Sequence, residues 1–267
     1  LKYKLSEVWM ISIAILRASV VVVLTLVLIP IYLIGLFLEY FFGKRLVVSL
    51  IKKLWSRAVM KIIGVGRDLI GLGSEANIFV SNHISWIDIL AINSTLDVVF
   101  IAKNEVRSWP GLGLLAVLGQ TIFIERKSLK ALSQKHTLDE CLKKGQSVFF
   151  FPEGTSTDGS NVKKFKSSLF EVCYSDFFKK NNWGSVQPIT IIYKSPITDD
   201  PSFYSFWREE DTIFANIRKI IKRVGQGRVQ LVLHRPLQFS KYRDRKDLSN
   251  ACFKTIKNGL ANSAHSF

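Results

Sequence analysis

From Glu75 onward, short apolar runs alternate with segments of helical periodicity, and this alternation constrains the fold more than any other feature. Runs such as Ile78-Phe79-Val80 and Val148-Phe149-Phe150-Phe151 are typical of buried strands. Strands that alternate with helices favour a mostly parallel sheet. The sequence therefore predicts an α/β fold, with a mostly parallel central sheet flanked by helices. We expect strands at 76–82, 98–102, 121–124, 147–151, 187–193 and 228–234, and helices at 86–93, 109–118, 129–144, 166–179, 211–224 and 246–261.

A long stretch without charged residues precedes this alternating region. Residues 18–38 contain no Asp, Glu, Lys or Arg, and a helix of this length can cross the hydrocarbon core of a bilayer. Pro30 and Gly35 interrupt the stretch, so a kinked or re-entrant element is a second interpretation, and a buried core helix is a third. Lys and Arg occur on both sides, so the distribution of positive charge indicates no orientation.

Residues 46–63 combine apolar positions at helical spacing with basic residues between them, namely Lys52, Lys53, Arg57 and Lys61. This pattern is typical of a basic amphipathic helix that lies on a membrane surface. An amphipathic helix packed on the rest of the protein has the same pattern, and we hold the two interpretations equal.

The balance of charge indicates the kind of partner. Lys and Arg number 37 against 21 Asp and Glu, which gives a formal net charge of +16. Such a charge implies a polyanionic partner, either nucleic acid or an anionic membrane surface. The positive mean hydropathy favours the membrane, and many basic residues adjoin the apolar N-terminal region, so we expect no nucleic acid. The histidines show no metal-ligand spacing, so we expect no metal, and the three scattered cysteines are typical of reduced thiols facing the cytoplasm.

His83 lies where the strand predicted at 76–82 gives way to the helix predicted at 86–93. Open α/β sheets place their ligand crevices at the carboxyl ends of strands. A histidine there can accept a proton near neutral pH, because its unperturbed pKa is about 6.5. Asp88 is the nearest carboxylate in sequence, and on a straight helix the two would point about 140° apart. They therefore meet only if the chain turns between them; otherwise His83 is a capping or core histidine and Asp88 an ordinary first-turn carboxylate.

The spacing His83-x-x-x-x-Asp88, followed by Phe151-Pro152-Glu153-Gly154-Thr155-Ser156, resembles the glycerolipid acyltransferase family, whose best-known members are the lysophosphatidate acyltransferases. Gly119-Gln120-Thr121-Ile122-Phe123-Ile124-Glu125-Arg126 is similar to the second block of that family, and Val186-Gln187-Pro188-Ile189-Thr190 to the fourth. The blocks come in the family's order. The resemblance spans roughly residues 76–194 and implies a fold of the glycerol-3-phosphate acyltransferase type. We expect the catalytic domain to occupy residues 64–267, preceded at 1–63 by a membrane anchor and amphipathic helix.

The resemblance also implies an activity. A fatty acyl group would pass from an acyl thioester, either acyl-CoA or acyl-carrier protein, to the free hydroxyl of a lysolipid acceptor, with no cofactor. His83 would act as the general base and Asp88 would orient it, as in a serine-protease triad. The protein would lie at the inner membrane with its catalytic domain facing the cytoplasm. The substrate-binding residues implied are Lys103, Arg126, Glu153, Gly154, Thr155 and Ser156.

Two lysolipids compete as the acceptor. Arg126 favours 1-acyl-sn-glycerol-3-phosphate, which would give phosphatidate, because a guanidinium binds phosphate through two parallel hydrogen bonds. The run Ser156-Thr157-Asp158-Gly159 instead looks closer to a branch that acylates lyso-ornithine lipid. We place lysophosphatidate first. A non-catalytic membrane lipid-binding protein is an alternative of another class, and the intact His83–Asp88 pair speaks against it, since binding alone requires no base.

Overall fold

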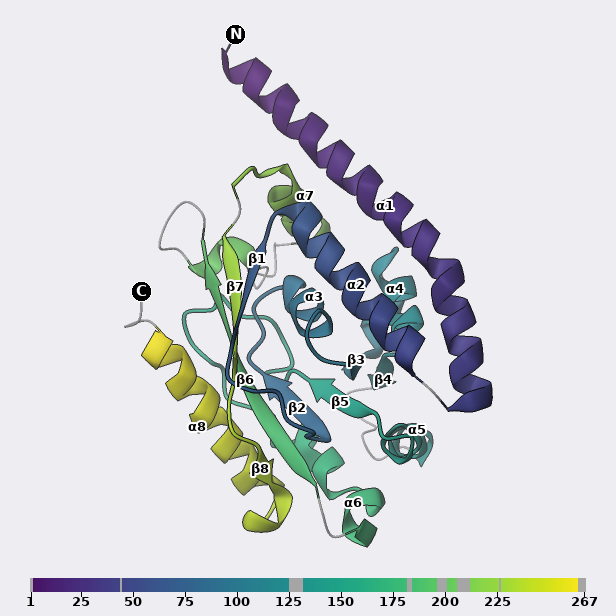
Figure 1. The fold of residues 1–267 in the computed structure, drawn as a ribbon. Helices are drawn as coiled ribbons and strands as arrows, with labels where there is room; N and C mark the ends of the chain where they lie inside the picture. The colour runs from purple at the N-terminus through teal and green to yellow at the C-terminus, as the bar shows by residue number, and fades with distance from the viewer. Residues whose placement is uncertain are drawn as a thin grey trace.

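The computed structural model describes residues 2–43, 45–124, 132–181, 184–195, 201–205, 212–225 and 227–263. Within these residues one eight-stranded sheet runs in the order β1-β7-β6-β2-β5-β3-β4, and β8 pairs with β6 (Figure 1). The strands are β1 (Gly66–Ile70), β2 (Ile78–Ser81), β3 (Val98–Lys103), β4 (Ile122–Ile124), β5 (Ser147–Phe150), β6 (Ser185–Lys194), β7 (Arg228–Leu233) and β8 (Leu237–Gln238). The helices are α1 (Lys2–Phe42), α2 (Leu46–Ile63), α3 (Ile87–Asn93), α4 (Leu112–Leu118), α5 (Leu132–Lys143), α6 (Asp176–Asn181), α7 (Ile213–Lys222) and α8 (Arg245–Ser263).

The mostly parallel sheet that the sequence predicts is confirmed. β2 pairs in parallel with β5 on one side and with β6 on the other, and β3 pairs in parallel with β5 and β4. Only β7 and β8 run antiparallel to β6, and β1 follows β7 in parallel. The carboxyl ends of β2, β5, β3 and β6 therefore meet at one edge of the sheet, where open α/β folds place their sites.

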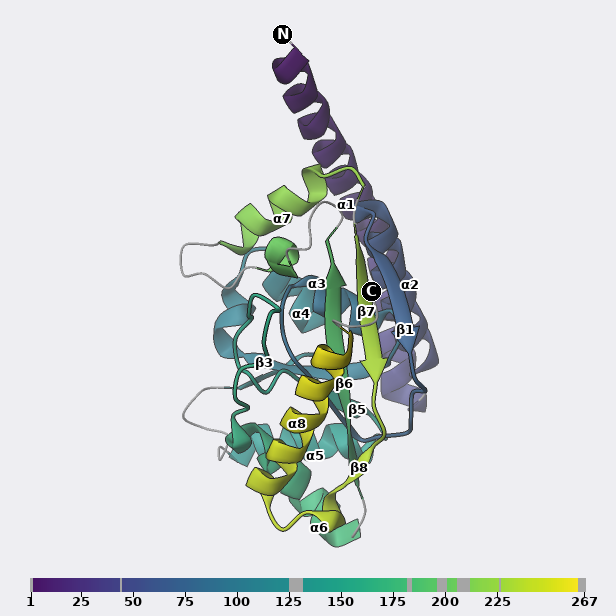
Figure 2. The ribbon, with the colours of Figure 1, turned by 90° about the vertical axis from the view of Figure 1, so that its left-hand side faces the viewer.

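Both faces of the sheet are covered because successive strand residues point to opposite sides. Phe79 of β2 and Phe149 of β5 join one core with residues of α2, α3 and α7. Their neighbours Ile78, Val80 and Phe150 join a second core with residues of α5, α6 and α8. Figure 2 shows α8 on the face away from α2. Burying one such side chain contributes about 1.5–3 kcal/mol, so the apolar runs dictate a strand covered on both sides.

Four elements differ from the sequence predictions. β1 and β8 were not predicted, because neither carries the apolar run that marks a buried strand; β1 is an edge strand with partly exposed residues. The helix predicted at 166–179 is a 3-10 segment at Ser167–Tyr174 followed by the short helix α6. The helix predicted at 109–118 begins only at Leu112, after another 3-10 segment at Asn104–Ser108. Further 3-10 segments lie at Pro201–Tyr204 and Phe239–Lys241.

The uncharged N-terminal stretch forms the middle of α1, a continuous helix despite Pro30. Its residues 7–42 are long and apolar enough to cross a membrane by length and composition. One side of α1 nevertheless contacts the rest of the protein at intervals along its length (Figure 1). The Thr25 hydroxyl accepts a hydrogen bond from the Trp55 indole at 2.9 Å, and the Tyr32 hydroxyl donates to the carbonyl of Leu118. The opposite side of α1 leaves large apolar side chains exposed.

The helix α2 packs on the core of the sheet. This agrees with the interpretation of residues 46–63 as an amphipathic helix packed on the rest of the protein. Lys52, which the membrane-surface interpretation placed on an outer basic face, points inward instead. Its ammonium donates to the carbonyl of Val98 at 2.7 Å, and burial lowers the pKa of Lys52 to about 8. Lys52 could not be separated from its exposed basic neighbours by spacing alone, because its long side chain reaches a carbonyl at the sheet edge.

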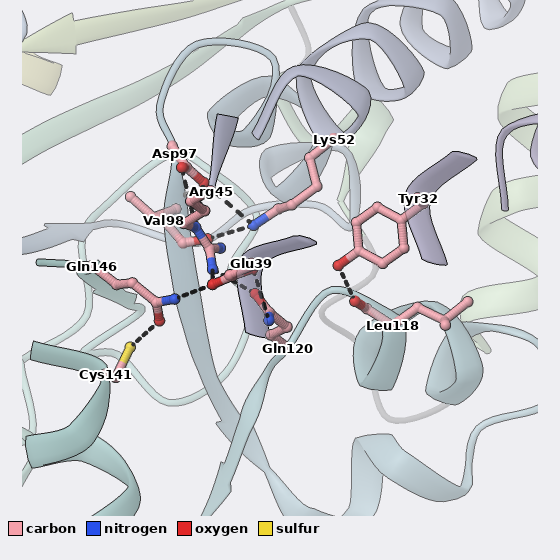
Figure 3. A network of polar contacts seen from close by, with 10 residues as sticks. All are labelled: Tyr32, Glu39, Arg45, Lys52, Asp97, Val98, Leu118, Gln120, Cys141 and Gln146. Atoms are coloured by element: carbon pink, nitrogen blue, oxygen red, sulfur yellow. Dashed lines mark hydrogen bonds and ion pairs between the residues drawn. The ribbon is translucent and has the colours of Figure 1, made fainter. Parts of the chain in front are cut away.

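A polar network joins the end of α1 to the sheet, centred on Arg45 (Figure 3). The Arg45 guanidinium contacts Glu39 of α1 at 3.0 Å, Asp97 before β3 at 3.1 Å and the side-chain oxygen of Gln120 at 2.5 Å. Gln146 donates to Glu39 at 2.8 Å. Arg45 and Glu39 are largely buried, so each charge depends on the other for compensation.

Arg45→Ala should therefore lower the free energy of unfolding by about 3 kcal/mol, because it leaves the largely buried Glu39 without its cation. Chemical unfolding of the purified protein in detergent measures this. The matched control is Arg228→Ala, which breaks the exposed pair with Asp68 and should leave the unfolding midpoint almost unchanged. Equal, small effects of the two substitutions would show that the network does not stabilise the fold.

Candidate active site

His83 follows the carboxyl end of β2, and its neighbour Asn82 fixes that end to β6. The Asn82 side chain donates to the carbonyl of Ile191 at 2.9 Å and accepts from the Ile191 N–H at 2.8 Å. Asn82 is buried, so both of its side-chain polar groups need these partners. The backbone therefore leaves the sheet at a defined position, and the next side chain is held at the sheet edge.

The side chains of His83 and Asp88 are in contact, because the chain turns between them. His83 Nδ1 lies 2.8 Å from Asp88 Oδ2. The turn is made by Ile84, Ser85 and Trp86, after which α3 begins with Asp88 in its first turn. Asp88 has no exposed side-chain surface, whereas His83 is 17% exposed. The pair thus has a buried anchor and a ring that reaches solvent.

The Asp88 carboxylate accepts hydrogen bonds from further groups. Its Oδ2 also accepts from the backbone N–H groups of Ile84 at 2.8 Å and Ser85 at 3.0 Å. Its Oδ1 accepts from the hydroxyl of Tyr193, on β6, at 2.6 Å. Burial, followed by the negative charge of Asp88, raises the pKa of Tyr193 well above its ordinary value, so the tyrosine remains a donor.

This set of donors decides which histidine nitrogen is free. An ionised carboxylate can only accept hydrogen bonds, so the Nδ1 that faces Asp88 carries the hydrogen. In neutral His83 the lone pair is then on Nε2, away from Asp88. The ring of Phe151 stacks on the His83 ring, with centroids 3.9 Å apart and planes 20° apart, and limits its rotation. The arrangement can accept a proton at Nε2 while Asp88 stabilises the resulting imidazolium.

The loop after β5 holds the backbone of His83 from two sides. Glu153 Oε1 accepts from the His83 N–H at 2.7 Å, and the N–H of Thr157 donates to the His83 carbonyl at 2.8 Å. The second oxygen of Glu153 accepts from the N–H of Lys163 at 2.8 Å. Burial raises the pKa of Glu153 to about 7, and the two N–H donors act in the opposite direction. This loop therefore positions the histidine, a role that the sequence analysis did not assign to it.

The other predicted binding residues that the structure describes lie at the same edge of the sheet. Gly154 adopts a φ of +69° in the turn after β5, where a Cβ would come within 2.6 Å of the Lys166 ammonium. Thr155 is exposed and Ser156 is buried. Lys103 ends β3, two strands from β2 and at the same edge. Arg126 lies outside the described residues, and the substrate contacts of all five remain predictions.

Tyr193 and Asn216 are contacts of this site that sequence reasoning missed. Trp86, between His83 and Asp88, donates through its indole to the side-chain oxygen of Asn216, on α7, at 3.0 Å. Asn216 in turn donates to the carbonyl of Ser205 at 2.7 Å. The only available signal was a polar group in an apolar segment: a hydroxyl within the run Ile189–Tyr193, and an amide among the isoleucines of α7.

In the part of the chain that the structure describes, no group of three His, Cys, Asp or Glu side chains gathers as a metal site would require. Cys141, Cys173 and Cys252 are buried free thiols. Burial raises the pKa of Cys141 to about 11, so this thiol is a poor nucleophile at neutral pH.

Comparisons with known proteins agree with this geometry. The sequence model of the family described as Acyltransferase matches residues 73–192, which include His83, Asp88 and the loop after β5. A lyso-ornithine lipid O-acyltransferase from Rhodobacter capsulatus is 38% identical over 68% of this chain, and the match spans 64% of that protein's length. A 1-acyl-sn-glycerol-3-phosphate acyltransferase from Neisseria gonorrhoeae is 39% identical over 34% of this chain and 36% of its own.

The fold is also found among solved structures. The crystal structure of the 1-acyl-sn-glycerophosphate (LPA) acyltransferase PlsC from Thermotoga maritima superposes with a TM-score of 0.60, covering 94% of this chain and 98% of that one at 20% identity. This likeness concerns the fold, including the long N-terminal helix. The sequence match, in turn, assigns residues 73–192 to the acyltransferase family.

Proposed function

We propose that the protein is a membrane-bound O-acyltransferase that moves a fatty acyl group from an acyl thioester to the free hydroxyl of a lysolipid. The observation that carries the proposal is the 2.8 Å contact between His83 Nδ1 and the buried Asp88, which leaves Nε2 as a base. An alcohol has a pKa far above 7, so it needs such a base as it attacks a carbonyl. A thioester is already activated, so the reaction needs no nucleophile from the enzyme.

The reaction proceeds in two proton transfers at His83. Nε2 takes the hydroxyl proton while the acceptor oxygen bonds to the thioester carbonyl carbon. The imidazolium, stabilised by Asp88, then gives this proton to the departing sulfur as the C–S bond breaks, and the products are an ester and a thiol. The N–H groups of Ile84 and Ser85 already bind Asp88, so the oxyanion must be stabilised by other donors.

For the acceptor we propose lyso-ornithine lipid, with lysophosphatidate as the second candidate. The lyso-ornithine lipid acyltransferase is 38% identical over 68% of this chain, whereas a 1-acyl-sn-glycerol-3-phosphate acyltransferase that matches a similar share, 72%, is 28% identical. The run Ser156-Thr157-Asp158-Gly159 supports the same order. Arg126 supports the second candidate, because a guanidinium suits a phosphate. The higher identity thus reverses the order that the sequence block with Arg126 favoured.

We also propose that α1 lies within one leaflet rather than across the bilayer. Arg17 donates to the carbonyl of Arg223, behind α7, at 2.6 Å, and Glu39 joins the network of Arg45. These contacts are about 33 Å apart at 1.5 Å per residue, which is the thickness of a hydrocarbon core. The uncharged stretch 18–38 lies between them. If α1 crossed the bilayer, the charged elements packed along it would also lie in hydrocarbon, which is costly.

An assay of purified protein with a labelled acyl thioester and a panel of lysolipids tests the reaction and the acceptor. The wild type should acylate lyso-ornithine lipid with a higher kcat/KM than lysophosphatidate. His83→Ala should lose about 10²–10⁴ in rate on the same acceptor, since that is the usual contribution of a positioned base. A folded wild type with no turnover on any lysolipid would favour the non-catalytic alternative. A higher kcat/KM for lysophosphatidate would make it the first candidate for the acceptor.

Tyr193→Phe tests whether the hydroxyl on β6 positions the pair. The loss of a hydrogen bond to a charged group costs roughly 1.5–3 kcal/mol, so kcat should fall by about tenfold or more. The kcat of each variant is measured on the same acceptor. Tyr204→Phe is the control, since its ring lies beside Tyr193 but its hydroxyl binds the N–H of Gly227. An equal loss of kcat in both variants would argue against a specific role for Tyr193.

The position of α1 can be tested with a membrane-impermeant thiol reagent on sealed vesicles. Cysteines introduced as Glu7→Cys and Lys241→Cys would both lie at exposed positions, while the native thiols are buried. A helix within one leaflet makes both new thiols react from the same side of the membrane. Reaction of the two from opposite sides would instead establish a membrane-spanning α1. Resistance to a high-salt wash should hold in either case, because apolar attachment is insensitive to salt.

A further inference from the structure

A basic pocket lies apart from His83, where the end of α2, the start of β1 and the end of α3 meet. It encloses about 380 Å³, and its polar lining is Arg57, Lys61, Arg67 and Ser94, with Met60 and Val65 as an apolar wall. One water occupies about 30 Å³ in the liquid, so the pocket is large enough for a tetrahedral anion and its hydration. Three cations line it, and no carboxylate does.

The two arginines are fixed in place by the end of α3. Arg57 Nε donates to the Ser94 carbonyl at 2.8 Å, and Arg67 Nη1 donates to the same carbonyl at 2.9 Å. Arg67 Nη1 also lies 2.6 Å from the Ser94 hydroxyl and 2.9 Å from that of Thr95. Since one carbonyl receives both side chains, the two guanidiniums are held next to each other. Each has further N–H groups, because a guanidinium carries five.

The positive charge of this pocket is uncompensated within the described residues. Asp68, the acidic neighbour of Arg67 in sequence, is paired with Arg228, whose Nε lies 2.7 Å from its Oδ2. No ion pair with Arg57, Lys61 or Arg67 occurs in the described part of the chain. Burial lowers the pKa of Arg67, and the positive charge of Arg57 lowers it further. An anion between them would relieve this repulsion.

The outer face of α2 indicates where the pocket lies relative to a membrane. Leu46, Leu50 and Leu54 are 80%, 52% and 46% exposed, and they form one stripe at helical spacing. The stripe continues with Arg57 and then Lys61, both exposed. A stripe that changes from leucine to arginine and lysine matches the change from acyl chains to headgroups. The pocket thus lies at the basic end of this stripe.

We propose that Arg57, Lys61 and Arg67 form a binding site for a phosphate group, separate from the His83–Asp88 site. Guanidinium and ammonium groups that converge on a cavity without a carboxylate suit a phosphate. The phosphate comes from an anionic phospholipid headgroup or from a soluble phosphate. The site concerns binding and does not depend on the acyl transfer proposed above. The contrasting interpretation is that both arginines only compensate the carboxyl end of α3, in which case Lys61, which contacts no acceptor there, should have no effect.

The experiment measures binding by isothermal titration of the full-length protein in detergent. The probes are short-chain phosphatidylglycerol, which has an anionic phosphodiester, short-chain phosphatidylcholine, whose headgroup is neutral overall, and inorganic phosphate. We expect saturable binding of phosphatidylglycerol at one site. Lys61→Gln and Arg57→Gln should each weaken it by about tenfold to a hundredfold, the usual effect of losing a charge-assisted hydrogen bond. Lys53→Gln is the matched control for Lys61→Gln. It removes the same charge two turns earlier on α2, and Lys53 does not line the pocket.

The probes also distinguish the sources of the phosphate. Displacement of phosphatidylglycerol by inorganic phosphate would show that the phosphate alone is recognised and that a soluble phosphate can occupy the site. Binding of the lipid without such displacement would identify a headgroup site. The proposal is overturned if the wild type binds neither phosphatidylglycerol nor inorganic phosphate saturably. It is also overturned if Lys53→Gln weakens binding as much as Lys61→Gln does. Thermal unfolding of each variant confirms that it is folded, and Lys61→Gln should be neutral in that measurement.

Discussion

The buried carboxylate of Asp88 is the interaction on which the site depends. A fully buried charge is tolerated only when hydrogen-bond donors replace its lost hydration. Here the donors are His83 Nδ1, two backbone N–H groups of the turn and the Tyr193 hydroxyl. They come from the end of β2, the start of α3 and the far part of β6. The carboxylate therefore fixes the relative positions of three elements, and the histidine tautomer follows from the same arrangement.

The loop after β5 adds a second constraint that changes how its motif should be interpreted. Glu153 and Thr157 bind the backbone N–H and carbonyl of His83, so the loop determines where the base lies. Family resemblance implies that the same block binds the acceptor. A loss of activity on replacing Glu153 would not separate these roles, because a displaced base and a lost substrate contact both slow the reaction. Substitution of the exposed Thr155, which does not contact the His83 backbone, addresses substrate binding more directly.

The predictions from sequence succeeded where a local pattern has one physical outcome. The runs around Phe79 and Phe149 can be satisfied only by strands covered on both sides, and the five-residue spacing of His83 and Asp88 requires a turn. The sequence pattern failed to predict the features that contacts between distant segments determine. β1 exists because it pairs with β7, Lys52 points inward because a carbonyl is within reach, and Tyr193 contacts Asp88 across 105 residues of sequence. None of these contacts leaves a periodic signal in the chain.

A set of contacts joins α1 to the turn between His83 and Asp88. Arg17 of α1 binds two carbonyls at the carboxyl end of α7, where a cation is favoured by the helix dipole. Asn216 of α7 then accepts from Trp86, which lies between His83 and Asp88. The positions of α1 and of the His83 turn are therefore linked by hydrogen bonds at the two ends of α7. For an acceptor that remains in the bilayer, as the proposed function requires, these contacts fix how far the hydroxyl must travel from the membrane to Nε2.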